Sequence, residues 1–200
     1  EGFSGTSAGI IIFIGKAWDA ITDPFMGQLS DRTISRFGRR RIYFLLGSLP
    51  VFFSWVMLWY GFGITGSTAR FIYYTLAYIF FSTSFTIVMV PYNAILSDMV
   101  RDYNRRSAFT GMRLAFSAAA AIICATVPAL ITGAYTDPKK AYLFMGLSFG
   151  ALFSVCWLGV FFGTWENQMT PVTAVSIKDW LSVIKNRSFR IYVTIFIICQ

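Results

Sequence analysis

Five long apolar segments divide the chain and constrain its fold more than any other feature. They cover residues 3–29, 42–64, 71–96, 108–131 and 141–162, and a sixth begins at Ile191. Each complete segment has 20 or more residues. That length lets an α-helix cross about 30 Å of hydrocarbon. Only 13% of the 200 residues are charged, against roughly a quarter in soluble domains. The sequence therefore predicts an all-α, multi-pass membrane protein.

The basic residues fall mostly in alternate connections between these segments. Twelve of the 17 Lys and Arg lie in three connections, residues 30–41, 98–106 and 163–190, whereas the two other connections hold three. Because loops rich in Lys and Arg stay in the cytoplasm, we expect these three connections to be cytoplasmic and Glu1 to lie outside. Membrane orientation thus explains the net charge of +8, and we expect no binding of nucleic acid.

Three parts are predicted from this pattern. Residues 1–163 would form a partial transmembrane bundle of five spans, residues 164–190 a cytoplasmic linker, and residues 191–200 the start of the next span. Within the linker, four apolar residues can share one face of a short amphipathic helix on the membrane surface: Val175, Trp180, Leu181 and Ile184. Since the chain begins without Met and ends in an apolar run, we expect a piece of a longer protein, with an earlier span before it.

The residue types do not indicate an enzyme. There is no His, which excludes His-based metal sites and His general bases, and no Gly-rich phosphate loop or nucleophile motif is present. Three cysteines, Cys124, Cys156 and Cys199, lie in apolar runs without paired spacing. They are expected to be packing residues rather than disulfides or metal ligands. We therefore expect no enzymatic reaction and no organic cofactor.

The first apolar segment contains three charged residues. Lys16, Asp19 and Asp23 lie three and four residues apart, so on a helix they share one face. An ionised Asp near the middle of a span costs about 2.5–3.5 kcal/mol, so such residues usually have a function. One interpretation is a cation site, because two convergent carboxylates suit a small hard ion or a proton. The other is a structural Lys16–Asp19 ion pair that holds helices together.

Two features add oxygen atoms near these acids. Pro24 cannot donate a hydrogen bond to the Ala20 carbonyl, so it frees an oxygen in the same helix. Thr86 precedes a proline by five residues and an aspartate by twelve, the same offsets that follow Asp19. Since both segments are predicted to run inward, Thr86 should lie near the depth of Asp19 and can complete an ion's oxygen shell. Alternatively, its hydroxyl bonds its own helix backbone.

The connection at residues 27–41 has a spacing that is typical of one transporter superfamily. Glycines, an acid and arginines follow in order, at Gly27, Asp31, Arg32, Gly38, Arg39 and Arg40. This order resembles the loop between the second and third spans of the major facilitator superfamily, with two extra residues before the second glycine. The resemblance implies that the acid and the arginines form a gate that holds the cytoplasmic side shut. Without this resemblance, the arginine cluster would indicate only that the loop lies on the cytoplasmic side.

A narrower resemblance comes from the run KAWDAITDPFMG at residues 16–27. It closely resembles the second span of the melibiose-permease-like glycoside–pentoside–hexuronide:cation symporters. FTIVMVPYNAIL and GMRLAFS resemble their fourth and fifth spans. The resemblance implies the N-terminal part of a major facilitator helical bundle, with spans two to six and the start of span seven. It also implies that Asp19 and Asp23 bind Na⁺, Li⁺ or H⁺ with help from Thr86.

The same resemblance implies four candidate substrate-binding residues: Lys16, Met89, Asn93 and Arg113. A fifth-span arginine that contacts sugar in the family matches Arg113, although a snorkelling anchor would look the same in the sequence. At Met89 and Asn93 the sugar-transporting relatives carry Asp and Trp, which leaves a galactoside substrate open. A lysolipid-carrying animal branch shares the K-A-W-D-A-x-T-D-P run.

Together these features predict a symporter in a plasma membrane or a bacterial inner membrane. We expect it to couple Na⁺ or H⁺ to the uptake of a sugar, glycoside or related small polar solute by alternating access. Its partners would be that solute, the lipid bilayer and the C-terminal half of the same protein. The alternatives are a cation-coupled lysolipid carrier and a membrane scaffold or receptor that does not transport.

Overall fold

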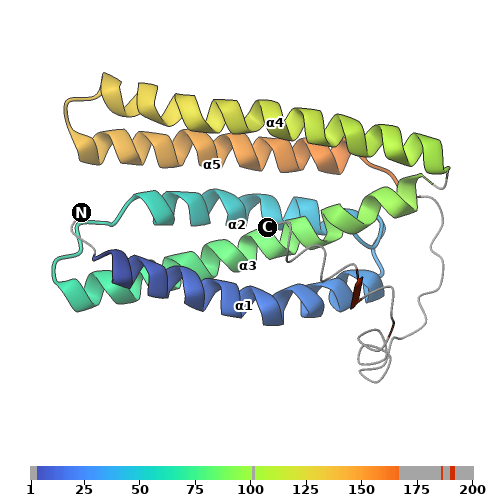
Figure 1. The fold of residues 1–200 in the computed structure, drawn as a ribbon, viewed down its shortest axis with the longest axis horizontal. Coiled ribbons are helices and arrows are strands. Elements are labelled where there is room, and N and C mark those ends of the chain that lie inside the picture. The colour runs from blue at the N-terminus through green and yellow to red at the C-terminus, as the bar shows by residue number, and fades with distance from the viewer. Residues whose placement is uncertain (1–3, 101, 167–185, 187–189, 192–200) are drawn as a thin grey trace. The chain divides into compact units, whose positions relative to one another are not determined.

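Five long helices make up the described part of the chain in the computed structural model of Figure 1. The structure describes residues 4–100, 102–166, 186 and 190–191. Within these residues no strand occurs, and the helices are α1 (Gly5–Arg32), α2 (Arg41–Trp59), α3 (Ser67–Met99), α4 (Tyr103–Ala134) and α5 (Pro138–Gly163). Each helix coincides with one of the five apolar segments. The prediction of an all-α fold is confirmed.

Local sequence determines where these helices begin and end. The side chains of Ser4, Asp102 and Asp137 each accept a hydrogen bond from the backbone N–H two residues later, which caps α1, α4 and α5. Helix α2 ends before its apolar segment does. The reason is a turn in which the backbone adopts positive φ at Phe62 and Gly63, a conformation that a helix cannot include.

Four of the helices, α2 to α5, are long and apolar enough to cross a membrane. Helix α1 has 28 residues but carries Lys16, Asp19 and Asp23 in its middle, and it does not meet the same apolar requirement. The helices therefore indicate a multi-pass membrane protein, and the crossing of α1 stays a prediction.

Residues 170–200 form a unit separate from residues 1–169. Only Asn186, Arg190 and Ile191 are described in it. The predicted amphipathic helix lies outside the described residues, and so does the predicted last span beyond Ile191. The predicted boundaries of the linker therefore stay predictions.

The hydrophobic core lies around α2, which packs against both α3 and α5 and lies between them in Figure 1. Its buried members come from these three helices: Phe44, Val51, Val88, Ile95, Trp157 and Phe161. Helix α1 packs against α3, and α4 makes fewer contacts, chiefly with α5, and has no buried residue. The pairing of α1 with α3 brings the charged residues of α1 to a second helix.

Close approach of α2 and α3 depends on Gly47. A Cβ atom at this position would overlap the Val88 side chain and would lie 3.2 Å from Ile87 Cγ2. Glycine within a helix is less favourable than alanine by about 1 kcal/mol, so packing rather than helix propensity explains the residue. The absence of a side chain lets α2 and α3 pack side by side.

Candidate cation site and charge network

Each of the two acids in α1 meets a hydroxyl group from α3. Ser82 Oγ donates a hydrogen bond to Asp19 Oδ1, and Thr86 Oγ1 donates one to Asp23 Oδ1 at 2.8 Å. One helical turn separates the two acids, and one turn separates the two hydroxyls. Because the pairs advance in the same order along both helices, α1 and α3 run parallel. Their contact places two carboxylates and two hydroxyls in one row.

Both carboxylate oxygens of Asp19 have partners. Oδ1 accepts from Ser82, and Oδ2 lies 3.2 Å from Lys16 Nζ, one turn earlier on α1. The Asp19 side chain is 19% exposed, whereas the Lys16 side chain is 70% exposed. The predicted Lys16–Asp19 pair therefore exists, and it is compatible with a cation site.

Asp23 has one hydrogen bond, from Thr86, among the described residues. Pro24 follows it within α1, so the Ala20 carbonyl receives no hydrogen bond from the amide four residues later. Carboxylate, hydroxyl and carbonyl oxygens are the ligands that hard cations prefer. Within the described residues no group of three or more His, Cys, Asp and Glu comes together. The candidate site thus offers two carboxyl groups, two hydroxyl groups and a backbone carbonyl.

Thr86 lies beside an acid, as its offsets predicted, but its partner is Asp23 rather than Asp19. The alternative, a bond to its own helix backbone, describes Thr83 instead, which donates to the Ile79 carbonyl at 2.8 Å. Thr83 also accepts from Trp18 Nε1 at 2.9 Å, a second polar contact between α1 and α3. Sequence reasoning missed Ser82. Its place four residues before Thr86 repeats the spacing of the two acids and was the available signal.

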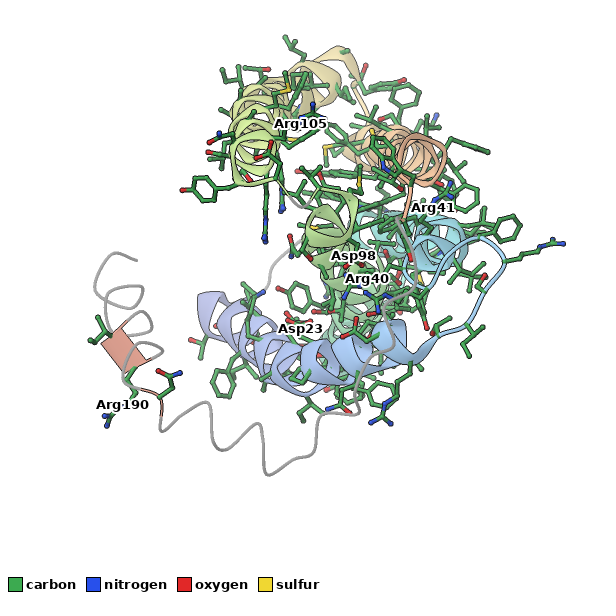
Figure 2. All side chains as sticks on the ribbon, turned by 90° about the vertical axis from the view of Figure 1, so that its right-hand side faces the viewer. Asp23, Arg40, Arg41, Asp98, Arg105 and Arg190 are labelled. Carbon is green, nitrogen blue, oxygen red and sulfur yellow. The ribbon has the colours of Figure 1, made fainter. Side chains whose placement is uncertain are left out.

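Where α1 and α3 end, two acids contact one arginine. Arg40 NH2 lies 2.5 Å from Asp31 Oδ1, and Arg40 NH1 lies 2.5 Å from Asp98 Oδ2. Arg39 NH2 lies 3.0 Å from the same oxygen of Asp98. Both arginines are buried, and Figure 2 shows Arg40 beside Asp98. We call Asp31, Arg39, Arg40 and Asp98 the charge network; through it Arg40 bridges the ends of two helices.

The sequence predicted three members of the charge network and missed Asp98, which pairs with both arginines. The tripeptide Leu-Ser-Asp occurs at residues 29–31 and again at residues 96–98, so the two acids end matching segments. Arg32, also predicted for the gate, is exposed and forms no ion pair within the described part of the chain. Gly27 has open space, since a Cβ there would meet only Val90 Cγ1 at 3.8 Å.

The structure separates the four candidate substrate residues. Arg113 NH2 donates to Asn93 Oδ1 at 2.7 Å, and its guanidinium lies over the Tyr92 ring at 4.7 Å from the centroid. Met89 packs instead against the hydrophobic core, and Lys16 pairs with Asp19. Asn93 and Arg113 thus form a polar contact between α3 and α4, and Met89 does not take part in it.

Cavities lie at both ends of the helices. One of about 140 Å³ adjoins Arg113 and Tyr92. The other, of about 960 Å³, lies at the opposite ends of the helices, where Trp59, Tyr78 and Tyr142 contribute to its wall. None of the predicted site residues lines this larger cavity. The candidate site is thus defined by side-chain contacts between α1 and α3 and lies apart from the larger cavity.

The chain belongs to the family described as MFS/sugar transport protein, whose match covers residues 2–200. This is a family of membrane transport proteins and not of enzymes, in agreement with the resemblance to the major facilitator superfamily. Together with the four apolar helices, the family establishes a multi-pass membrane protein.

Relatives of the chain are named as symporters. The putative glycoside/cation symporter YagG of Escherichia coli is 31% identical over 94% of this chain and 42% of its own length. The inner membrane symporter YicJ of the same organism is 30% identical over 95% and 41%. The sodium-dependent lysophosphatidylcholine symporter 1 of Gallus gallus is 30% identical over 66% of this chain and 25% of its own length. The chain thus spans about a quarter to two-fifths of the length of these relatives.

Proposed function

We propose that this chain is part of a secondary active transporter that couples a cation, Na⁺ or H⁺, to symport of a small polar solute by alternating access. The solute would be a sugar, a glycoside or a related compound. The names of the relatives support symport, and two of them, from Escherichia coli and Gallus gallus, carry "cation" and "sodium-dependent" in those names. The carboxylate–hydroxyl row between α1 and α3 supports a site for the coupling ion.

That row is the observation that carries the proposal. Two carboxylates at membrane depth are costly unless a cation or a proton compensates their charge. The hydroxyls of Ser82 and Thr86 donate to these acids in the structure, and a hydroxyl oxygen can equally face a cation once the ion is bound. Ion binding would therefore replace these hydrogen bonds with contacts from the same oxygens to the cation.

Alternating access needs a link between this site and one membrane face. Asp19 and Asp31 lie on α1, and Thr86 and Asp98 lie on α3, twelve residues apart in each case. At helical rise this separation is about 18 Å. The same two helices thus carry the ion site and the charge network. Ion binding that shifts α1 against α3 would act on both.

A second candidate solute is a lysolipid, and a relative named for lysophosphatidylcholine favours it. In either case we assign Asn93 and Arg113 to solute binding, because they form a polar contact between α3 and α4. Competition between glycosides and lysolipids for uptake distinguishes the two.

Substitution of either acid tests the proposed function. In the full-length protein in proteoliposomes, Asp19→Asn and Asp23→Asn should each abolish cation-driven accumulation of solute, because each removes one of the two charges that attract the ion. Solutes should first be screened with and without Na⁺. Asp102→Asn, the same change at the exposed cap of α4, is the control and should leave accumulation intact. Accumulation against a gradient by either α1 variant contradicts its place in the site.

A further inference from the structure

Glu166 contacts the beginning of α2 from beyond the end of α5. Its Oε2 accepts a hydrogen bond from the Arg39 N–H at 3.0 Å. Its Oε1 accepts from the Arg40 N–H at 2.9 Å and from the Arg41 N–H at 3.1 Å. We call these contacts the Glu166 clamp. One carboxylate thereby satisfies three consecutive backbone donors.

The clamp supplies a cap that α2 lacks in its own sequence. The N-cap residue, Arg40, forms no capping hydrogen bond with its side chain. The first N–H groups of a helix have no partner within the helix, and they form its positive end. A carboxylate there makes hydrogen bonds roughly twice as strong as those of a neutral acceptor. Glu166 thus binds the end of α5 to the start of α2.

Gly38 makes room for the clamp. Its φ is +104°, a left-handed conformation that glycine adopts without strain. A Cβ atom at Gly38 would lie 2.9 Å from the carboxyl carbon and from Oε1 of Glu166. The carboxylate can therefore reach the three N–H groups because this residue has a positive φ and because it has no side chain.

The clamp holds the backbone of the two arginines in the charge network. Arg39 and Arg40 each donate a backbone N–H to Glu166, and their guanidinium groups reach Asp98. Arg41 is fixed as well, since its NH2 donates to the Phe161 carbonyl at 2.7 Å. Because the guanidinium of Arg40 is buried and bridges two acids, a small shift of its backbone would break at least one of these contacts.

We propose that Glu166 is a positioning residue for the charge network. By fixing the backbone at the start of α2, it holds Arg40 where the side chain bridges Asp31 and Asp98, and so it keeps the cytoplasmic side closed. The consequence for transport rests on the proposed function. The effect on the charge network does not, and it can be measured without any solute.

A double-mutant cycle tests the proposal on the full-length protein. We choose Glu166→Gln, Arg40→Gln and the double variant, each in a cysteine-free background with a reporter Ser30→Cys, a position beside Asp31 on α1 that is 1% exposed. The measurement is the rate of labelling by a maleimide from the cytoplasmic side. Glu166→Gln should raise this rate about fivefold, since the amide keeps one neutral acceptor oxygen and its NH2 group cannot accept from a backbone N–H. Once Arg40 is replaced, adding Glu166→Gln should change the rate no further.

If Glu166 only capped α2, its replacement would lower stability without affecting the charge network. Asp137→Ala removes a side-chain cap from α5 and serves as the control. It should lower the melting temperature without raising the labelling rate. If Glu166→Gln does only the same, or if its effect on labelling adds to that of Arg40→Gln, the positioning role is wrong.

A shorter acid keeps the test decisive if the amide variant does not insert into the membrane. Glu166→Asp retains the charge but withdraws it by one methylene, and the same cycle with this variant should show a smaller, equally non-additive rise. Additive effects in this cycle contradict the proposal. If the full-length protein takes up no solute with any cation, the proposed function is wrong. The labelling result does not depend on that outcome.

Discussion

At the scale of single residues, the hydroxyl of Thr86 is the part of the candidate site that the structure defines best. It donates to Asp23 and not to its own helix backbone. In an ion-bound site the same oxygen would turn a lone pair toward the cation. The group then contributes to ion binding directly, and its removal should affect affinity more than folding.

Thr86→Val tests this, because valine keeps the shape of threonine and lacks the hydroxyl. We expect the Na⁺ affinity of the full-length protein, measured by isothermal titration calorimetry, to fall about tenfold, the effect of one lost polar ligand. Thr126→Val is the matched control, since the Thr126 hydroxyl bonds only backbone carbonyls of its own helix. Equal affinities for the wild type and Thr86→Val would remove Thr86 from the site.

At the scale of helices, the contact of α2 with α3 depends on an absent side chain. Gly47→Ala should lower the melting temperature of the purified protein, because its Cβ would overlap Val88 and overpacking costs about 1–3 kcal/mol. Gly159→Ala in α5 is the control: nothing lies within 4 Å of a Cβ there, so better helix propensity should leave stability equal or higher. Comparable melting temperatures for the two variants would show that α2 and α3 do not need this close approach.

The helices were predictable from sequence because each apolar segment is long enough for a helix that crosses a membrane. The offsets of Thr86 predicted a place near Asp19, but its hydrogen bond goes to Asp23, one turn further along α1. Ser82 carried a weaker signal, since a serine within a span is common. Glu166 carried none: its partners at residues 39–41 lie more than 120 positions away, and only packing of α5 on α2 brings them together. Met89 was predicted to bind substrate from its match to the family, but it packs against the hydrophobic core. A match to a family position does not determine which neighbours surround a side chain.

At the scale of the whole molecule, α1 and α3 connect the candidate ion site with the charge network. If Asp19 and Asp23 bind the coupling ion, protons and Na⁺ must compete for the same carboxylates. Acidification would then weaken Na⁺ binding, because each acid must lose its proton before it can bind the metal ion. This competition is the central claim of the symport account, and it is independent of which solute is carried.

Calorimetric titration of the full-length protein with Na⁺ at a series of pH values tests that claim most directly. We expect Na⁺ affinity to weaken steadily as the pH falls, and we expect no binding heat from Asp19→Asn or Asp23→Asn at any pH. Asp102→Asn should behave like the wild type. A Na⁺ affinity that is the same at every pH, or that survives in either α1 variant, would contradict a shared carboxylate site.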